Sequence, residues 1–132
     1  MAFPILVTAA IIHKDNKILI TQRKKEQHNG LRWEFPGGKL DFGEDLRSCL
    51  EREIKEELGI KIKANKIISY SSHVYGGEKH IVLIAFACDF ISGKIEKKEI
   101  NNFAWISLKE AKDYDITEAD LPFIEELKQQ GK

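Results

Sequence analysis

The feature that most constrains this chain is a stripe of apolar residues with the period of an α-helix. Its members recur about every four residues: Leu46, Cys49, Leu50, Ile54 and Leu58. Such spacing is typical of a helix that buries one face against a core. We therefore expect a helix from about Asp45 to Leu58, ended by Gly59.

Three glutamates lie on the face of this expected helix away from most of the stripe. Glu53, Glu56 and Glu57 stand at i, i+3 and i+4, which brings their carboxylates together. Like charges at this spacing destabilise a helix by roughly a few tenths of a kcal/mol per pair. Arg52, four positions before Glu56, neutralises only part of this charge. A hard divalent cation such as Mg²⁺ would neutralise the rest, because it prefers oxygen ligands and binds carboxylates together with substrate phosphates.

The alternative is a solvated acidic surface, which is the commoner role of a charged helix face. The surrounding residues favour the metal site. Gly37 and Gly38 precede the helix, Glu44 stands at its entrance and Gly59 at its exit. They predict a loop, a helix and a second loop whose backbone can approach a ligand closely. A solvated helix requires none of them.

The same segment carries a known family pattern. From Gly38 to Ile60 the chain reads GKLDFGEDLRSCLEREIKEELGI. It fills every specified position of the Nudix box, G-x5-E-x7-R-E-U-x-E-E-x-G-U, in which U is a bulky aliphatic residue. The chain thus resembles the Nudix hydrolases. This resemblance implies an α/β fold, an α/β/α sandwich with a mixed β-sheet and the Nudix loop-helix-loop.

Strand patterns surround the helix. The segments 3–13 and 17–22 flank Lys14-Asp15-Asn16, which predicts a hairpin. Residues 33–35 are expected to form a short strand stopped by Pro36-Gly37-Gly38. Further strands are expected over 61–72, 79–90 and 103–106, with 79–90 central in the sheet because it is rich in Ile, Val, Leu and Phe.

Two more helices are expected near the C-terminus. Residues 107–110 read as a capping box for a short helix, and a final helix follows Asp120 and runs to about Gln129, with Pro122 in its first turn.

Composition bounds the class of protein. The 132 residues, 42% of them hydrophobic, suit one domain over 1–132. Lys plus Arg and Asp plus Glu both number 21, so no overall basic charge attracts a nucleic-acid polymer. Cys49 and Cys88 lie in apolar contexts without a C-x-x-C pattern, which favours buried thiols and a cytoplasmic protein, although a disulfide stays open. The apolar N-terminal run lacks a basic flank, so we expect a first strand rather than a signal peptide, and no membrane span.

The resemblance extends beyond the box to the MutT branch of small nucleoside triphosphate pyrophosphohydrolases. Residues 31–39, LRWEFPGGK, are similar to the W-E-F-P-G-G-K stretch that precedes the box in that branch. Residues 20–23, ITQR, resemble its second strand. Residues 116–122, ITEADLP, are similar to the stretch before its last helix.

The resemblance implies a role for each matching residue. The implied metal ligands are Gly37, Glu53, Glu56, Glu57 and Glu99, with Mg²⁺ as the cofactor and Mn²⁺ as a substitute. Arg52 is expected to orient a glutamate and Glu44 to support the site. A proton is expected to pass from water to Glu53, or else to Glu99, which is otherwise a surface charge in the run 96–99.

The implied substrate is a small nucleotide that water attacks at the β-phosphorus, leaving nucleoside monophosphate and pyrophosphate. The residues expected to contact it are Arg23, Glu34, Phe35, Gly37, Gly38, Lys39, Lys79, Ala119 and Asp120. Branch members that prefer 8-oxoguanine carry asparagine where Asp120 stands. The form Ala-Asp-Leu-Pro resembles relatives that act on CTP, modified cytidine nucleotides and some oxidised purines such as 8-oxo-dGTP. The alternatives are a core position for Phe35 and a helix cap for Asp120.

We expect a monomer or homodimer that sanitises the nucleotide pool and binds neither a membrane nor a nucleic-acid polymer. Two other readings stay open. One is a Nudix enzyme acting on ADP-ribose, a dinucleoside polyphosphate or an RNA cap. The other is a non-catalytic nucleotide-binding module, which would be expected to lose box glutamates, and none is lost.

Overall fold

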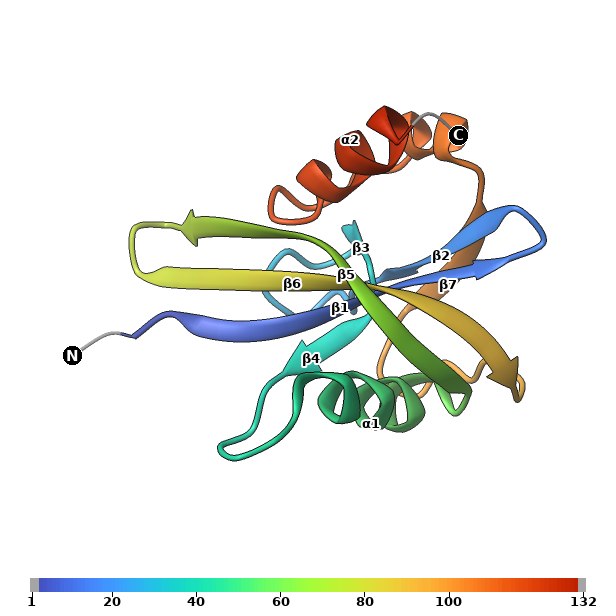
Figure 1. Cartoon of the computed structure of the whole chain (residues 1–132). Coiled ribbons are helices and arrows are strands. Elements are labelled where there is room, and N and C mark those ends of the chain that lie inside the picture. Colours follow the sequence, from blue (N-terminus) through green and yellow to red (C-terminus); the bar gives the residue numbers. More distant parts are fainter. Residues whose placement is uncertain (1–2, 131–132) are drawn as a thin grey trace.

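The structure of the chain, a computed structural model, describes residues 3–130 (Figure 1). Its elements in chain order are β1 (Ile5–Lys14), β2 (Lys17–Gln22), β3 (Trp33–Glu34), β4 (Gly37–Lys39), α1 (Leu46–Leu58), β5 (Lys61–Tyr75), β6 (Lys79–Ser92), β7 (Asn102–Ile106), the 3₁₀ helix η1 (Leu108–Asp113) and α2 (Leu121–Gln129). Within these residues seven strands form one sheet in the order β3-β2-β1-β6-β5, with β4 paired to β1 and β7 paired to β2. β1 and β6 are parallel and the other pairs antiparallel, so the predicted mixed sheet is confirmed.

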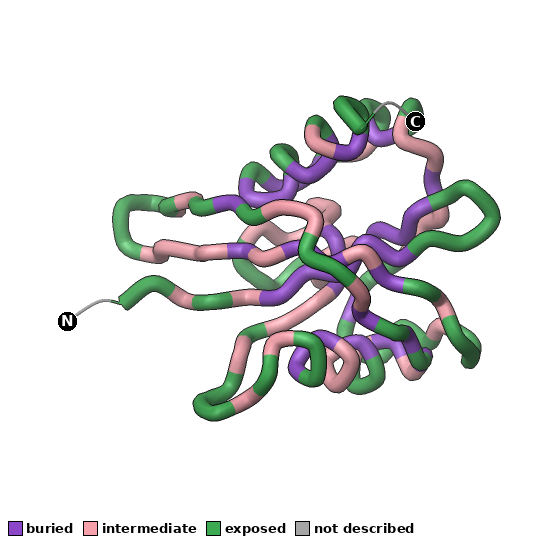
Figure 2. The backbone as a smooth tube through the Cα atoms, in the orientation of Figure 1, coloured by how far each residue is buried: buried purple, intermediate pink, exposed green. Residues whose placement is uncertain are grey.

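The two α-helices cover opposite faces of this sheet (Figure 1). Successive side chains of a strand point to opposite faces, and β1 shows this alternation. Ala9 and Ile11 join the core under α2, whereas Ala10 and Ile12 join the core under α1. Figure 2 shows the buried positions along the middle of the sheet and the inner sides of both helices. The predicted α/β/α sandwich is confirmed.

Helix α1 agrees with its prediction at both ends. The Asp45 carboxylate accepts the N–H groups of Arg47 and Ser48 at 3.1 and 3.2 Å and so caps the first turn. Gly59 ends the helix with φ of 74°, a left-handed conformation that glycine adopts without strain. Four members of the predicted stripe, Cys49, Leu50, Ile54 and Leu58, are buried in the core, and Leu46 is partly buried against it. Burying each of its aliphatic side chains contributes about 1.5–3 kcal/mol, which fixes the face that α1 turns to solvent.

The hairpins follow the predicted turns, and two strands are longer than predicted. Asp15 and Asn16 both have positive φ, as the tight turn between β1 and β2 requires. β5 runs to Tyr75 and β6 to Ser92, because the antiparallel pairing continues to the turn at 76–78 and on beyond Phe90. These extra residues show no clear apolar alternation, so the sequence gives no signal for them. β6 lies between β1 and β5, which confirms its central place.

β3 ends at Glu34, so the predicted stop at Pro36-Gly37-Gly38 is confirmed, but the strand β4 that starts at Gly37 was not predicted. Gly37 and Gly38 belong to β4, where they pair with Ala9 and Thr8 of β1. A Cβ on Gly37 would overlap the Thr8 carbonyl group, and a Cβ on Gly38 would overlap the Glu53 carboxylate. Glycine here marks close packing inside a strand rather than a break in structure.

Three smaller observations complete the description of the fold. The helix after Ser107 is a 3₁₀ helix, with the Ser107 N–H donating to Glu110 Oε1 at 2.8 Å as a capping box requires. Cys49 and Cys88 are both buried free thiols, so no disulfide joins them. Within residues 3–130, no helix has the length and apolar character needed to span a membrane.

Candidate active site

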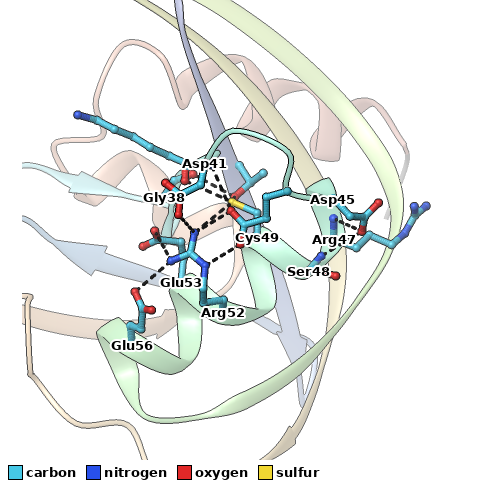
Figure 3. A network of polar contacts seen from close by, with 12 residues as sticks. Gly38, Asp41, Asp45, Arg47, Ser48, Cys49, Arg52, Glu53 and Glu56 are labelled. Carbon is cyan, nitrogen blue, oxygen red and sulfur yellow. Dashed lines mark hydrogen bonds and ion pairs between the residues drawn. The ribbon is translucent and has the colours of Figure 1, made fainter.

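Arg52 on α1 is the centre of a network of carboxylates (Figure 3). Its Nε and Nη2 bind the two oxygens of Glu44 at 2.7 and 2.9 Å, a bidentate pair that joins the loop before α1 to the helix. Its Nη1 binds Glu53 at 3.0 Å and Glu56 at 3.1 Å. The predicted pairing of Arg52 with Glu56 is therefore present. One guanidinium therefore holds three of the four box glutamates, all but Glu57.

The charges of this network are reflected in pKa values. Hydrogen bonds from Arg52 lower the pKa of Glu44 to about 2, and the same bonds raise the pKa of Arg52. Glu44 is therefore ionised at neutral pH. Burial raises the pKa of Glu53, although its pairing with Arg52 acts in the opposite direction.

Glu57 lies in a different environment from its two neighbours in the box. Burial, followed by the charges of Glu34, Glu53 and Glu99, raises the pKa of Glu57 to about 9. Several carboxylates therefore converge here with too little positive charge around them. This imbalance is the one that a divalent cation would correct, so the donor set fits a hard metal ion.

The side chains are not arranged as a closed metal site. Among residues 3–130, no three His, Cys, Asp or Glu groups lie close enough together to hold a metal ion in this arrangement. The ion pairs of Arg52 explain part of this, because they hold Glu53 and Glu56 toward the guanidinium. The Glu53 carboxylate lies directly against the backbone of Gly38 in β4.

A cavity of about 240 Å³ opens beside this network. It is lined by all nine residues predicted to contact a nucleotide: Arg23, Glu34, Phe35, Gly37, Gly38, Lys39, Lys79, Ala119 and Asp120. Glu57 and Glu99 line it too, whereas Glu44, Arg52, Glu53 and Glu56 lie outside its lining. The structure thus brings residues from four distant parts of the sequence to one cavity. Glu99 is exposed, yet it faces this cavity.

Two acids lie in the cavity wall, Glu34, which is half-buried, and Asp120, which is buried. Glu34 accepts two hydrogen bonds from Arg23 Nη1, at 3.2 and 3.0 Å. Burial raises the pKa of Glu34, and Arg23 opposes that rise. Burial also raises the pKa of Asp120, and the charge of Glu34 is the next largest cause. The charge of Glu34 therefore raises the pKa of both Asp120 and Glu57.

Asp120 stands at the N-cap position of α2, yet its side chain makes no capping hydrogen bond. Its Oδ1 accepts the Phe35 N–H at 3.2 Å, and its Oδ2 accepts the Thr117 hydroxyl. The alternative role of Asp120 as a helix cap is therefore not what holds this carboxylate in place. Phe35 combines both of its alternatives, because it packs against Phe123 in the core and also lines the cavity.

Several cavity residues were not predicted from the sequence. Tyr75, His28 and Thr117 line the cavity, and the rings of His28 and Tyr75 meet edge to face at 5.3 Å between centroids. His28 lies between the expected strands 17–22 and 33–35, and Tyr75 lies between the expected strands 61–72 and 79–90, where no local pattern singles them out. Thr117 falls inside the predicted stretch 116–122, and that stretch is its only sequence signal.

Comparison with known proteins identifies the family. Residues 3–127 match the NUDIX domain. The chain belongs to the Nudix family. This Nudix protein is 36% identical over 119 residues to the CTP pyrophosphohydrolase of Escherichia coli (strain K12), covering 90% of this chain and 87% of that protein. It is 34% identical over 121 residues to the 8-oxo-dGTP diphosphatase of Buchnera aphidicola subsp. Schizaphis graminum (strain Sg), covering 92% and 91%.

A solved structure supports the same assignment. The solution structure of the E. coli ORF135 protein matches this Nudix protein with a TM-score of 0.85 and 34% identity, covering 97% of this chain and 91% of that one. These findings confirm the predicted family, its MutT-like branch, the fold and the prediction that this chain is a Nudix hydrolase.

Proposed function

We propose that this Nudix hydrolase converts a nucleoside triphosphate into a nucleoside monophosphate and pyrophosphate with the help of Mg²⁺. The observation that carries the proposal is a single cavity lined both by Glu57 and Glu99 and by Phe35 and Asp120. The charge of Glu34 raises the pKa of both Glu57, a proposed metal ligand, and Asp120, a proposed base contact, so the two lie near each other. A nucleotide would fit such a site, because its polyphosphate needs the metal ion and its base needs the second contact.

The proposed metal ligands are the carboxylates of Glu53, Glu56, Glu57 and Glu99 together with the backbone at Gly37. The excess negative charge around Glu57 supports this set, because a hard cation would remove the repulsion that raises its pKa. Bound Mg²⁺ would neutralise the triphosphate and lower the pKa of water. Mn²⁺ takes the same kinds of oxygen ligand and is expected to substitute.

Glu53 is the first candidate to accept the proton of the attacking water, and Glu99 is the second. One oxygen of Glu53, Oε2, is held by Arg52 at 3.0 Å, and the carboxylate lies against Gly38, so its position is fixed. Glu44 supports the arrangement by holding Arg52 from the other side. Glu53→Gln and Glu99→Gln distinguish the two, because the variant that loses the base should lose more activity at the same metal occupancy.

We propose a cytidine or oxidised nucleotide as the substrate. Asp120 supports this choice in its ionised form, because a carboxylate then only accepts hydrogen bonds and the N4 amino group of cytosine donates them. Each oxygen of Asp120 already accepts one hydrogen bond from the protein and has a second lone pair available. The same carboxylate can accept from N1–H and N2–H of an oxidised guanine. Two relatives bear the names CTP pyrophosphohydrolase and 8-oxo-dGTP diphosphatase, which agrees with both options.

One screen tests the proposed reaction and the substrate class together. The common and oxidised (d)NTPs, ADP-ribose and dinucleoside polyphosphates are incubated with the protein and Mg²⁺, and all phosphate products are measured. We expect monophosphate and pyrophosphate from a triphosphate, with ¹⁸O from labelled water in the pyrophosphate. Orthophosphate as the first product would overturn the proposed reaction. A clear preference for ADP-ribose would overturn the proposed substrate class.

A further inference from the structure

Two side chains of β5 hold the backbone N–H and C=O of one residue, Ala119, in the segment before α2. The hydroxyl of Tyr75 accepts the N–H of Ala119 at 3.0 Å. The hydroxyl of Ser71 donates to the carbonyl oxygen of Ala119 at 2.6 Å. Ser71 and Tyr75 stand four positions apart in one strand, so they point to the same face of the sheet, the face under α2.

The other end of this segment is held by Arg32. Its guanidinium donates to Glu118 Oε1 at 2.7 Å, to the Ile116 carbonyl at 2.8 Å and to Asp115 Oδ1 at 3.3 Å. The backbone at Trp33 also bonds to the segment on both sides of Ile116, at 2.9 Å each. Residues 115–119 are therefore held from two directions, and Asp120 is the next residue in the chain.

The bonds to Ala119 have no replacement from solvent. Ala119 is 4% exposed and Ser71 is 7% exposed, so water does not reach this peptide freely. A buried N–H or carbonyl group that loses its partner carries its full cost of desolvation. The segment would move to find another partner, and Asp120 would move with it because one peptide bond joins them.

We propose that Tyr75 and Ser71 are positioning residues for base selection: by holding Ala119 they place the Asp120 carboxylate where it contacts the base. This inference rests on the proposed function, because it requires that the cavity bind the base of a nucleotide. Neither residue belongs to the box, and neither contacts Arg52 or the box glutamates through a hydrogen bond or ion pair among residues 3–130.

A substitution can test the hydroxyl of Tyr75 independently of its ring. The ring lies beside His73 and His28, at 4.4 and 5.3 Å between centroids. Tyr75→Phe keeps this ring and removes only the acceptor of the Ala119 N–H. Ser71→Ala removes the donor to the Ala119 carbonyl. The strand also offers matched controls on its other face, Tyr70→Phe and Ser72→Ala, because Tyr70 is 74% exposed and Ser72 bonds only to His80.

The experiment measures base ranking without relying on turnover. Calorimetry gives the Kd of CMP, UMP and 8-oxo-dGMP for the wild type, both single variants, their double variant and both controls. Hydrolysis of the matching triphosphates with Mg²⁺ then gives kcat and KM. Both single variants are included so that a double variant that fails to fold does not prevent the comparison.

We expect the ratio of Kd values between the least and most favoured base to fall about fivefold or more in the single variants, and further in the double variant. KM for the favoured substrate should rise while kcat stays within about twofold, because a contact made equally in ground and transition state affects only binding. The controls should keep the wild-type ranking.

Each remaining outcome is decisive. Variants that keep the ranking within about twofold while Tm falls would show that the two bonds only stabilise the fold. A wild type that binds all three monophosphates equally would also overturn the inference, since there would be no selection to position. A wild type that ranks the monophosphates but hydrolyses no triphosphate would instead overturn the proposed function and leave the positioning role standing.

Discussion

At the scale of single residues, Glu57 destabilises the metal-free fold and is also a candidate metal ligand. It is a partly buried carboxylate whose neighbours Glu34, Glu53 and Glu99 carry the same charge. No hydrogen bond or ion pair to Glu57 from another side chain occurs within residues 3–130. A fold without a metal ion gains nothing from a charge at this position. We propose that this charge serves to bind a metal ion.

Replacing Glu57 with glutamine tests this directly. We expect Glu57→Gln to lower kcat by about two orders of magnitude or more, because it removes a ligand charge and keeps the volume. The metal-free variant should have a slightly higher Tm than the wild type, because a buried carboxylate is replaced by a neutral group. Steady-state kinetics and thermal unfolding in EDTA measure both effects. Glu125→Gln, an exposed glutamate on α2, is the matched control, and equal turnover in the two variants would contradict the role of Glu57.

Asp120 gives a second prediction at the residue scale. Asp120→Ala should lower the ratio of kcat/KM between CTP and UTP by roughly tenfold or more, because uracil presents a carbonyl where cytosine presents an amino donor. Asp120→Asn should shift the preference toward 8-oxo-dGTP, because an amide adds a donor that can meet a purine carbonyl. Asp113→Asn, exposed at the end of η1, serves as the control. Unchanged ranking in both Asp120 variants would remove this residue from base selection.

At the scale of an element, β4 places two adjacent glycines in different surroundings. A side chain on Gly37 would overlap the backbone of Thr8, whereas a side chain on Gly38 would overlap the carboxylate of Glu53. Backbone inside a sheet cannot move aside, but the end of a glutamate can. The same substitution should therefore affect stability at one position and activity at the next.

We expect Gly37→Ala to lower the free energy of unfolding by about 1–3 kcal/mol or more, because it forces β4 away from β1. Gly38→Ala should keep most of that stability and lower kcat by about tenfold or more, because Glu53 leaves its fixed place. Denaturant unfolding and kinetics on both variants make the comparison. Equal losses of stability in the two variants would contradict this account of β4.

The stability that the loop before α1 contributes should depend on pH, because Glu44 in this loop is paired with Arg52. Its pKa is lowered to about 2 by Arg52, so the folded state binds a proton less readily than the unfolded chain. The stability from this pair should be fully present above the ordinary carboxyl pKa and be lost as pH falls toward 2. Glu44→Gln should therefore lower Tm at pH 7 and have a smaller effect near pH 2. Thermal unfolding across this range measures the difference, and a constant difference would contradict the prediction.

The elements also show which parts of the site a sequence can reveal. Helix α1 could be predicted with its ends because its stripe, its Asp45 cap and its Gly59 stop are local signals. β4 could not, because its glycines read as a turn until their partners on β1 are known. Nothing local in the sequence marks Tyr75 and Ser71, because both bond to Ala119, which lies far along the chain.

At the scale of the whole molecule, the sheet gathers the cavity from distant segments. The family pattern predicted nine nucleotide-contacting residues, and all nine line one cavity. Their roles stay predictions, because lining a cavity does not show what binds there. Glu99 illustrates the difference, since only the motif marked it among its charged neighbours, and only the tertiary fold brings it to the cavity beside Glu57.

The parallel pairing of β1 with β6 has a consequence for the order of folding. Ile5 to His13 lie beside Ile81 to Asp89, and the whole of α1 lies in the chain between them. Closing so long a loop costs conformational entropy before the strand contacts contribute any favourable free energy, so contacts of this kind slow folding. The acidic helix can form early, but its carboxylates meet Glu34 and Glu99 only once the two central strands have paired. During synthesis, metal affinity should therefore appear late, after β6 has emerged.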